Sequence, residues 1–225
     1  RDRSLLTGDY PDDGWGWQKP GEAHATWFVA YYAHWSMQRE VRGALEALSQ
    51  GALLSDDPAR ARVFAHKAAL LLWQLAVYYP DYDYATQARE SKEHNPSYTG
   101  RITNMIWEVG WADTCAVAYD AVWPHLADDL ELQRQAGLDA AGLDRFVRDR
   151  LLMTMARDIT SGNGRNRGNF GAHQRALIRL ALALDEDTEA PTSAAMIAWV
   201  LANPKPVVDS DMGLVDALEN LVYRD

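Results

Sequence analysis

Long stretches of this chain carry apolar residues at helical spacing, and no alternating run of β-branched residues separates them. The expected helices cover residues 22–48, 57–79, 101–126, 138–159, 169–184, 190–201 and 212–222. The second of these has a clear start signal, because Pro58 follows two aspartates and proline is tolerated in a first helical turn. The pattern therefore predicts an all-α fold, with antiparallel helix pairs arranged as a ring, a solenoid or a bundle.

Two stretches lack this periodicity. Residues 7–21, "TGDYPDDGWGWQKPG", are rich in glycine and proline and are not expected to form a regular element. Residues 79–100, "YPDYDYATQARESKEHNPSYTG", are expected to form a linker. A chain of 225 residues can bury a substantial core, and no fixed-period repeat suggests an array. We expect one domain over residues 1–225 that continues beyond the last residue, since no helix stop signal precedes it.

The charge of the chain excludes one class of partner. A net charge of -10 and a pI near 5.0 argue against nucleic-acid binding, which needs a basic stripe to neutralise phosphates. An anionic ligand remains compatible with this composition if positive charge is concentrated locally. No apolar run is long enough to span a membrane, and the oligomeric state is left open.

Metal and cofactor motifs are missing from the sequence. It contains no HExxH, CxxC, GxSxG or GxxxxGK[ST] motif, and no two histidines stand four residues apart. Asp81 and Asp83 could contact calcium but lack the rest of a ligand loop. Cys115, the only cysteine, lies in an apolar run and is expected to be a buried thiol. We therefore expect neither a metal nor an organic cofactor.

Tryptophan and tyrosine are unusually frequent, with nine Trp and ten Tyr against four Phe. Both combine a flat apolar face with a polar edge, which suits stacking on sugar rings as well as core packing. Four residues of the first helix share one patch and fit a core: Trp27, Tyr31, His34 and Trp35. Trp15 and Trp17 lie in the loop before it and are better candidates for stacking platforms.

The segment 162–187, "GNGRNRGNFGAHQRALIRLALALDED", joins a polar loop to a helix expected to start near Asn169. The helical step aligns His173 with Leu177, Leu180 and Leu184, opposite Arg175 and Arg179. In one interpretation Asn169 is an N-cap and His173 a hydrogen-bonded core residue. In the other, Asn169 and the helix amides join Arg165 and Arg167 in a site for a carboxylate or sulfate.

A second candidate group lies in residues 98–120, "YTGRITNMIWEVGWADTCAVAYD". Helical spacing places one carboxylate in an aromatic stripe that comprises Asn104, Glu108, Trp111, Cys115 and Tyr119. Such a carboxylate must be paired, protonated or solvated by a cleft, because an isolated buried charge is too costly. Either Glu108 forms an ion pair with an arginine of a neighbouring helix, or Arg101, Trp107 and Glu108 line a groove.

These segments, above all "RGNFGAHQRALIRLALALD", resemble the α/α-toroid domain of heparinase II/III-like polysaccharide lyases, a group that includes alginate lyases. The resemblance covers most of the chain. It implies an incomplete (α/α) toroid that is the N-terminal part of a larger lyase, with a periplasmic or secreted location. It also implies an anionic polysaccharide or oligosaccharide as substrate, and it requires no cofactor.

The resemblance further assigns roles to residues. In the family, an Asn within a pattern like N-H-G-x-x-Q binds the uronate carboxylate, and Asn169, Gly171 and Gln174 match that pattern. Phe170 replaces the family's histidine, so His173 is the candidate substitute, and Tyr223 is the candidate for the family's catalytic Tyr. The reaction implied is β-elimination, in which Asn neutralises the carboxylate while Tyr or His acts as base and acid. The expected substrate-binding residues are Tyr98, Arg101, Trp107, Glu108, Arg165, Arg167, Gln174, Trp15 and Trp17.

Two other functions remain open from the sequence. An α/α-toroid glycoside hydrolase needs two carboxylates across the scissile bond. Glu108 and Asp113 are available, but their five-residue spacing does not place them side by side on one helix. A non-catalytic helical module that binds carbohydrate or protein would need no such pair.

Overall fold

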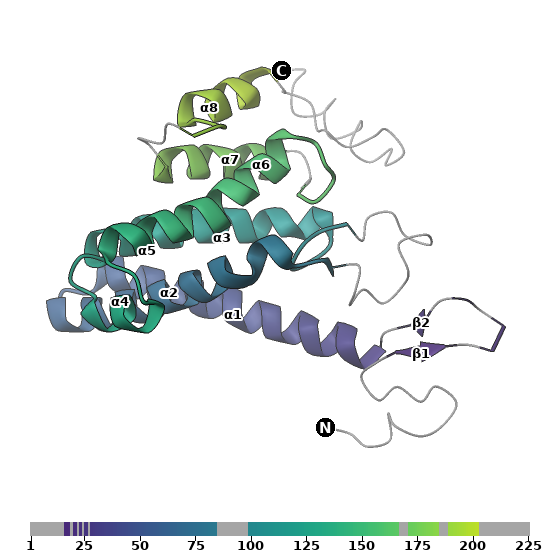
Figure 1. Cartoon of the computed structure of the whole chain (residues 1–225), viewed down its shortest axis with the longest axis horizontal. Coiled ribbons are helices and arrows are strands. Elements are labelled where there is room, and N and C mark those ends of the chain that lie inside the picture. The colour runs from purple at the N-terminus through teal and green to yellow at the C-terminus, as the bar shows by residue number, and fades with distance from the viewer. Residues whose placement is uncertain are drawn as a thin grey trace.

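The computed structural model describes residues 16–18, 20–21, 23, 25–26, 28–84, 99–166, 171–184 and 189–202. This part of the chain is mostly helical, so the predicted all-α class is confirmed (Figure 1). One exception is a short hairpin. Its first strand lies in the stretch expected to lack regular structure, but its second strand lies in the range 22–48 that was expected to be helical, and the helix begins only at Phe28. In this hairpin β1 (Trp17–Gln18) pairs with β2 (Ala25–Thr26) in an antiparallel ladder that places Trp17 opposite Thr26. Gly21 adopts a φ of +88° in the turn between the two strands, a conformation that glycine adopts without strain, and so it allows the chain to reverse direction.

The long helices pack both on neighbours in sequence and on helices distant in sequence. The first half of the chain contributes α1 (Phe28–Leu54), α2 (Pro58–Tyr78), the short η2 (Tyr79–Asp81), α3 (Met105–Val122) and the short η4 (Trp123–His125). The second half contributes α4 (Leu130–Ala136), α5 (Ala140–Val147), η5 (Arg148–Leu152), α6 (Met153–Thr160), α7 (Ala172–Ala183) and α8 (Ser193–Ala202). Helix α1 contacts α2 and α3, α3 contacts α7, and α7 contacts α8 (Figure 1).

Several helices differ from the sequence expectation. Helix α1 covers residues 28–54 and not 22–48, and α3 covers residues 105–122 and not 101–126. The helix expected over residues 138–159 is continuous from α5 to α6 but contains a π-helical turn, η5. Helix α4 was not expected, because seven residues are too few for a periodic pattern to stand out. Helix α7 begins at Ala172 and not near Asn169, because Gly171, at φ +80°, is its N-cap. The helix expected over residues 212–222 lies outside the described residues.

The core lies where the apolar faces of these helices meet. On α7 the predicted face is confirmed, since His173, Leu177, Leu180 and Leu184 are all buried. On the opposite face, Arg175 and Arg179 form ion pairs of 3.1 and 2.8 Å with Asp113 of α3. Cys115 is also buried, as expected, and burial raises the pKa of its thiol.

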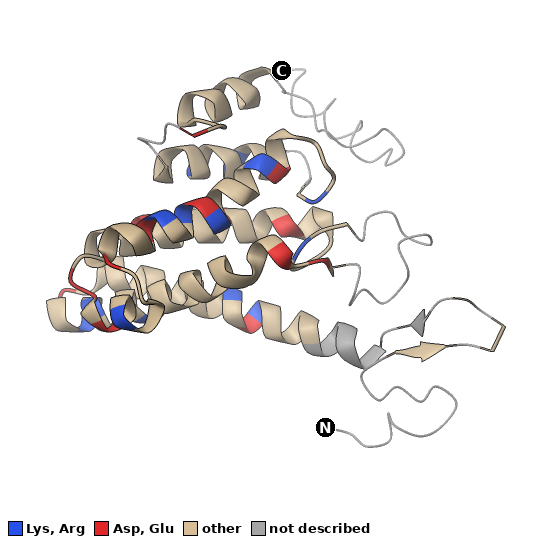
Figure 2. Ribbon diagram, viewed as in Figure 1, with Lys and Arg blue, Asp and Glu red and all other residues tan. Residues whose placement is uncertain are grey.

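Helices α2 and α7 carry only basic charged residues and α3 only acidic ones, so both signs are spread over the described helices and form no single basic stripe (Figure 2). Among the described residues, no helix combines the length and apolar character needed to cross a bilayer.

Candidate functional site

The C-terminal end of α2 is capped by two arginines from other parts of the chain. A helix C-terminus leaves carbonyl groups without intrahelical partners and carries partial negative charge. Arg150 of η5 and Arg101, which precedes α3, both donate hydrogen bonds to this end. The four acceptors are the carbonyls of Ala76, Val77, Tyr79 and Pro80, at 3.0, 3.0, 3.4 and 2.6 Å. This end of α2 is thereby tied to both α3 and the α5–α6 helix.

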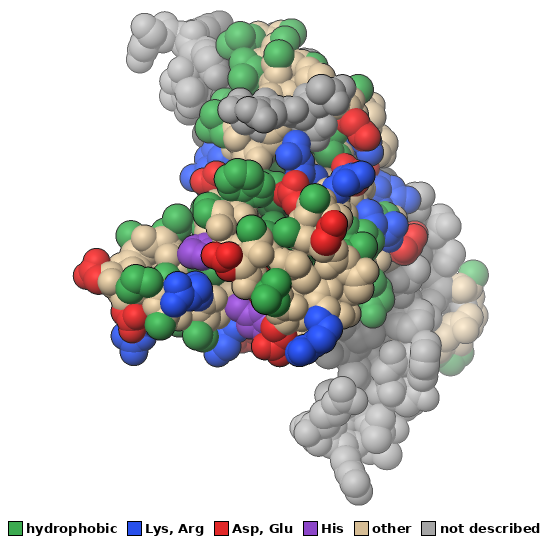
Figure 3. Space-filling model, turned by 60° about the vertical axis from the view of Figure 1, so that its left-hand side comes forward, with side chains coloured by type: hydrophobic (Ala, Val, Ile, Leu, Met, Phe, Trp, Pro, Cys, Tyr) green, Lys and Arg blue, Asp and Glu red, His purple; other side chains and the backbone are tan. Residues whose placement is uncertain are grey.

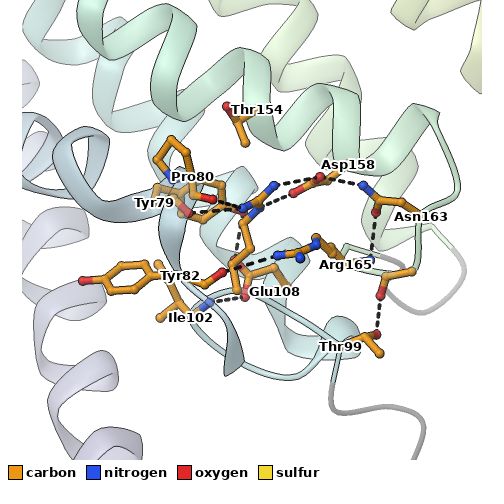
Figure 4. Close-up of polar contacts among 12 residues, drawn as sticks. Tyr79, Pro80, Tyr82, Thr99, Ile102, Glu108, Thr154, Asp158, Asn163 and Arg165 are labelled. Carbon is orange, nitrogen blue, oxygen red and sulfur yellow. Dashed lines mark hydrogen bonds and ion pairs between the residues drawn. The ribbon is translucent and has the colours of Figure 1, made fainter. Parts of the chain in front are cut away.

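Arg101 also anchors the polar loop that follows α6. Its Nε and Nη2 donate to the two carboxylate oxygens of Asp158, and the Nη2 to Oδ1 distance is 3.2 Å. Both side chains are buried. Asn163 donates to Asp158 Oδ1 at 2.8 Å, and the backbone amide of Arg165 donates to Asn163 Oδ1 at 3.0 Å (Figure 4). The loop is therefore built onto a buried, forked ion pair.

Two further hydrogen bonds hold the same loop against neighbouring segments. Thr99 Oγ1 donates to the carbonyl of Gly164 at 2.6 Å, and Arg165 Nη1 donates to the carbonyl of Tyr82 at 3.4 Å (Figure 4). Gly164 has a φ of +80°, which a glycine adopts without strain. These hydrogen bonds hold the stretch that leads to Asn169 as far as Arg165; Asn166 is the last described residue before Asn169.

Glu108 is fully buried and hydrogen-bonded to neutral groups. Oε1 accepts from the Tyr79 hydroxyl at 2.9 Å, and Oε2 accepts from the backbone amides of Ile102 and Thr103 at 3.0 and 2.8 Å. Burial raises the pKa of this carboxyl to about 7, against the opposing effect of these hydrogen bonds. Neither interpretation from the sequence holds for Glu108, because among the described residues it forms no ion pair with an arginine side chain, and it lines none of the cavities described below.

The raised pKa of Glu108 predicts a pH-dependent stability. The carboxyl titrates near 4.5 when unfolded and near 7 when folded, so the folded state binds more protons between these values. The free energy of unfolding should therefore fall as pH rises through this window, by about 3 kcal/mol from this group. In Glu108→Gln this pH dependence of the free energy of unfolding should vanish. In Glu46→Gln, at an exposed site, the free energy of unfolding should change with pH as it does in the wild-type protein. Urea unfolding from pH 5 to pH 8 measures this; equal slopes for Glu108→Gln and wild type would contradict it.

A cavity of about 320 Å³ lies next to this network, between α1, α2 and the start of α3. We call it the aromatic cavity; its polar and aromatic lining comes from His34, Gln38, Gln74, Tyr78, Tyr82 and Trp111. Tyr82 connects the cavity to the loop, because its carbonyl accepts from Arg165 while its ring points away from the Arg101 network (Figure 4). The loop before Asn169 therefore contacts a residue of the cavity wall.

The groups that line the aromatic cavity can transfer protons. His34 Nε2 forms a hydrogen bond with the carbonyl of Ile102. A carbonyl can only accept, so Nε2 carries the proton, and Nδ1 of the neutral ring carries a lone pair. Burial lowers the pKa of His34, which keeps the ring neutral at pH 7, and burial raises the pKa of Tyr82, which keeps its hydroxyl protonated. The cavity thus combines a neutral base with phenolic acids.

A second cavity, of about 280 Å³, lies between α1 and the start of α3. We call it the arginine cavity; it is lined chiefly by Trp35, Gln38, Arg39, Arg42, Glu46 and Trp107. The two cavities are neighbours, because both are lined by Gln38 and because Ile102 of one adjoins Thr103 of the other.

The structure separates the expected site residues into distinct groups. Trp107, 55% exposed, lines the arginine cavity, and Arg165 lies beside Tyr82. Arg101 and Glu108 differ from the expectation, because both are buried and bonded to protein groups: Arg101 anchors the loop after α6 through Asp158, and Glu108 holds the segment before α3. Trp17 lies in β1, in the hairpin that precedes α1, and is not part of the lining of either cavity (Figure 1). The remaining candidates outside the described residues are Asn169, Arg167, Tyr98, Trp15 and Tyr223.

His173 and Gln174 lie in the first turn of α7, where each contacts other parts of the protein. Gln174 Oε1 accepts from the backbone amide of Gly171 at 2.8 Å, which caps the helix. The His173 ring is buried and lies edge-on to Trp199 of α8, with 5.9 Å between centroids. These contacts match the core interpretation of His173 more closely than the catalytic one.

Sequence reasoning did not select His34, Arg39 or Arg42. His34 was assigned to a core patch on the basis of its aromatic neighbours. The sequence does contain a pattern that indicates these residues. His34, Gln38 and Arg42 follow one another at four-residue steps, on the face of α1 that also carries Leu45. Polar residues on a buried helix face need partners or a cavity, and here they adjoin two cavities.

A third cavity, of about 430 Å³, lies where α4 meets α2, at the end of the molecule shown in Figure 3. His66 Nδ1 lies 3.0 and 2.9 Å from the two carboxylate oxygens of Asp129, which also caps α4 by accepting from the amide of Leu132 at 3.0 Å. Histidine, basic and acidic side chains are mixed on this face (Figure 3). Within the described residues, no three or more histidine, cysteine or acidic side chains form a group that could hold a metal. The His66–Asp129 contact joins α2 to the start of α4.

No family model matches the chain, and the searches of curated proteins and of solved structures returned no match.

Proposed function

We propose that this chain belongs to a polysaccharide lyase that cleaves a uronate-containing polysaccharide by β-elimination, and that its helix pairs form part of an (α/α) toroid. One observation carries the proposal. A neutral histidine and two tyrosines, His34, Tyr78 and Tyr82, line one cavity whose wall is in contact with the arginine of the loop leading to Asn169.

The proposed reaction needs three kinds of group. The carboxylate of the uronate binds Arg165 and Asn169, which stabilise the negative charge that develops when the C5 proton leaves. His34 Nδ1 takes that proton, and the electron pair forms the C4–C5 double bond as the C4–O bond breaks. A tyrosine hydroxyl of the cavity protonates the departing oxygen. His34 replaces His173 as the proposed base, because His173 is buried in the contact between α7 and α8.

The contacts of the carboxylates favour elimination over hydrolysis. A hydrolase needs one carboxylic acid and one carboxylate facing the scissile bond. Glu108 is buried, and Asp113 is paired with Arg175 and Arg179, so this pair is not free for that role.

A product assay tests the proposed reaction. The purified protein is incubated with alginate, heparan sulfate, hyaluronan, ulvan and pectin while the ultraviolet absorbance of a 4,5-unsaturated uronate is followed. We expect that absorbance to rise with at least one polymer. New reducing ends without the absorbance would indicate hydrolysis, and binding without cleavage would indicate a carbohydrate-binding module.

Asn169→Ala is expected to lower turnover by about 10²–10³-fold, because the charge that develops on the carboxylate loses a hydrogen-bond donor. Asn169→Asp, which has the same shape but carries a negative charge, should be at least as inactive. Thermal unfolding of both variants should match wild type. Wild-type turnover in Asn169→Ala would remove this residue from the site.

A further inference from the structure

We propose that the arginine cavity is an anion subsite, which binds the carboxylate or sulfate of a sugar ring next to the ring that reacts. The identity of the polymer rests on the proposed function, whereas the site itself rests on the contacts of Arg42, Arg39 and the two tryptophans. The substrate class that follows is a polysaccharide with acidic groups on more than one ring.

Arg42 is held in place by α3. A Cβ added at Gly110 would lie 2.5 Å from Arg42 Nη1, so the guanidinium rests against the α3 backbone at the one position without a side chain. Arg42 Nε also forms an ion pair of 3.3 Å with Glu46 Oε1. Glu46 Oε1 in turn accepts from Thr114 Oγ1 of α3 at 2.8 Å. The guanidinium therefore has a fixed position before any ligand arrives, which lowers the ordering cost of binding.

The cavity has positive charge that the protein does not neutralise. Arg39 and Arg42 both line it, whereas Glu46 is the only acidic residue of its lining. Arg39 forms no ion pair within the described part of the chain, and its side chain is exposed. In a chain with a net charge of -10, this local excess selects an anionic ligand. Guanidinium groups bind carboxylates and sulfates through forked hydrogen bonds.

Trp35 and Trp107 give this anion site its preference for sugars. Both line the cavity, and Trp107 is 55% exposed although its ring is large and apolar. The exposed indole offers a flat apolar face on which a pyranose ring can stack, and the neighbouring guanidinium offers a positive charge for the acidic group of that ring. A small inorganic anion would use the arginines alone.

Calorimetric titration tests the subsite without relying on turnover. The ligands are an oligouronate, a sulfated neutral oligosaccharide and an unmodified neutral oligosaccharide of equal length. We expect the wild-type protein to bind at least one anionic ligand, and the comparison of the first two shows whether carboxylate or sulfate is recognised. Arg42→Gln and Arg39→Gln should each weaken that binding by about tenfold, the loss typical of one hydrogen bond to a charged group.

Gly110→Ala provides a variant that leaves every charge unchanged. The added methyl group displaces the Arg42 guanidinium, while alanine is a better helix former than glycine, so the fold is retained. It should weaken anion binding as Arg42→Gln does, whereas Arg134→Gln, at an exposed position on α4, should bind as wild type does. Trp107→Ala should weaken binding of the oligosaccharide but not of inorganic sulfate.

The outcomes separate the subsite from the proposed reaction. Anion binding that the cavity variants weaken, without any unsaturated product, would support the subsite and overturn the lyase. Unsaturated product formed with wild-type KM by Arg42→Gln and Gly110→Ala would support the lyase and overturn the subsite. Equal affinity for the neutral oligosaccharide, or no binding of either anionic ligand, would also overturn the subsite.

Discussion

Replacing Arg101 with methionine is expected to lower the free energy of unfolding by about 3–5 kcal/mol, because it leaves the buried carboxylate of Asp158 without its charged partner. The carbonyls of Tyr79 and Pro80 at the end of α2 lose a donor in the same variant. Asn163 still donates to Asp158, but one amide does not compensate a buried charge. Urea unfolding at pH 7 measures the loss, with the denaturant slope expected to remain that of wild type.

Arg150→Met is the matched control for this prediction. Arg150 caps the same helix end, but its acidic partner Asp81 is 3.6 Å away and largely exposed. We expect a loss of about 1–2 kcal/mol, from the two hydrogen bonds to Ala76 and Val77. The double variant Arg101→Met/Asp158→Leu should recover part of the loss, because an apolar pair replaces the buried charges. A loss in Arg101→Met no larger than that in Arg150→Met would contradict the role given to the buried ion pair.

His34→Gln is expected to lower turnover by about 10²–10⁴-fold, the usual contribution of a general base. The glutamine amide can still donate to the carbonyl of Ile102, but it cannot accept the C5 proton. In the wild-type protein, kcat/KM should fall at acidic pH as His34 becomes protonated. That fall should occur below the ordinary histidine range because burial lowers its pKa. The residual kcat/KM of the variant should not show this fall at acidic pH, which we call the acidic limb of the pH profile.

His66→Gln is the corresponding control. His66 is also hydrogen-bonded and partly buried, but it contacts Asp129 where α4 docks on α2. It should keep wild-type turnover and an unchanged acidic limb. Wild-type turnover in His34→Gln would remove His34 from the proposed reaction and return the assignment of the base to histidine or tyrosine residues elsewhere.

The repeating features of this fold were predictable from the sequence alone. Helix packing buries one face of each helix, and that face recurs every three or four residues, so the all-α class could be predicted. The inward face of α7, with His173 aligned on its leucines, followed from the same step. The start of α7 was less predictable, because whether Asn169 or Gly171 caps the helix depends on how the preceding loop is held.

The partners of the polar residues were decided only by the tertiary structure. Periodicity placed Glu108 in an aromatic stripe, but its donors come from Tyr79 and from the backbone before α3. Arg101 finds its carboxylate 57 residues away on α6, and His34 finds its carbonyl 68 residues away at Ile102. Local spacing determines which face of a helix is buried, whereas the docking of helices distant in sequence determines which polar groups meet there. For this reason the all-α class and the buried face of α7 followed from the sequence, whereas only the tertiary structure brought His34 and Tyr82 to one cavity and Arg165 to the carbonyl of Tyr82.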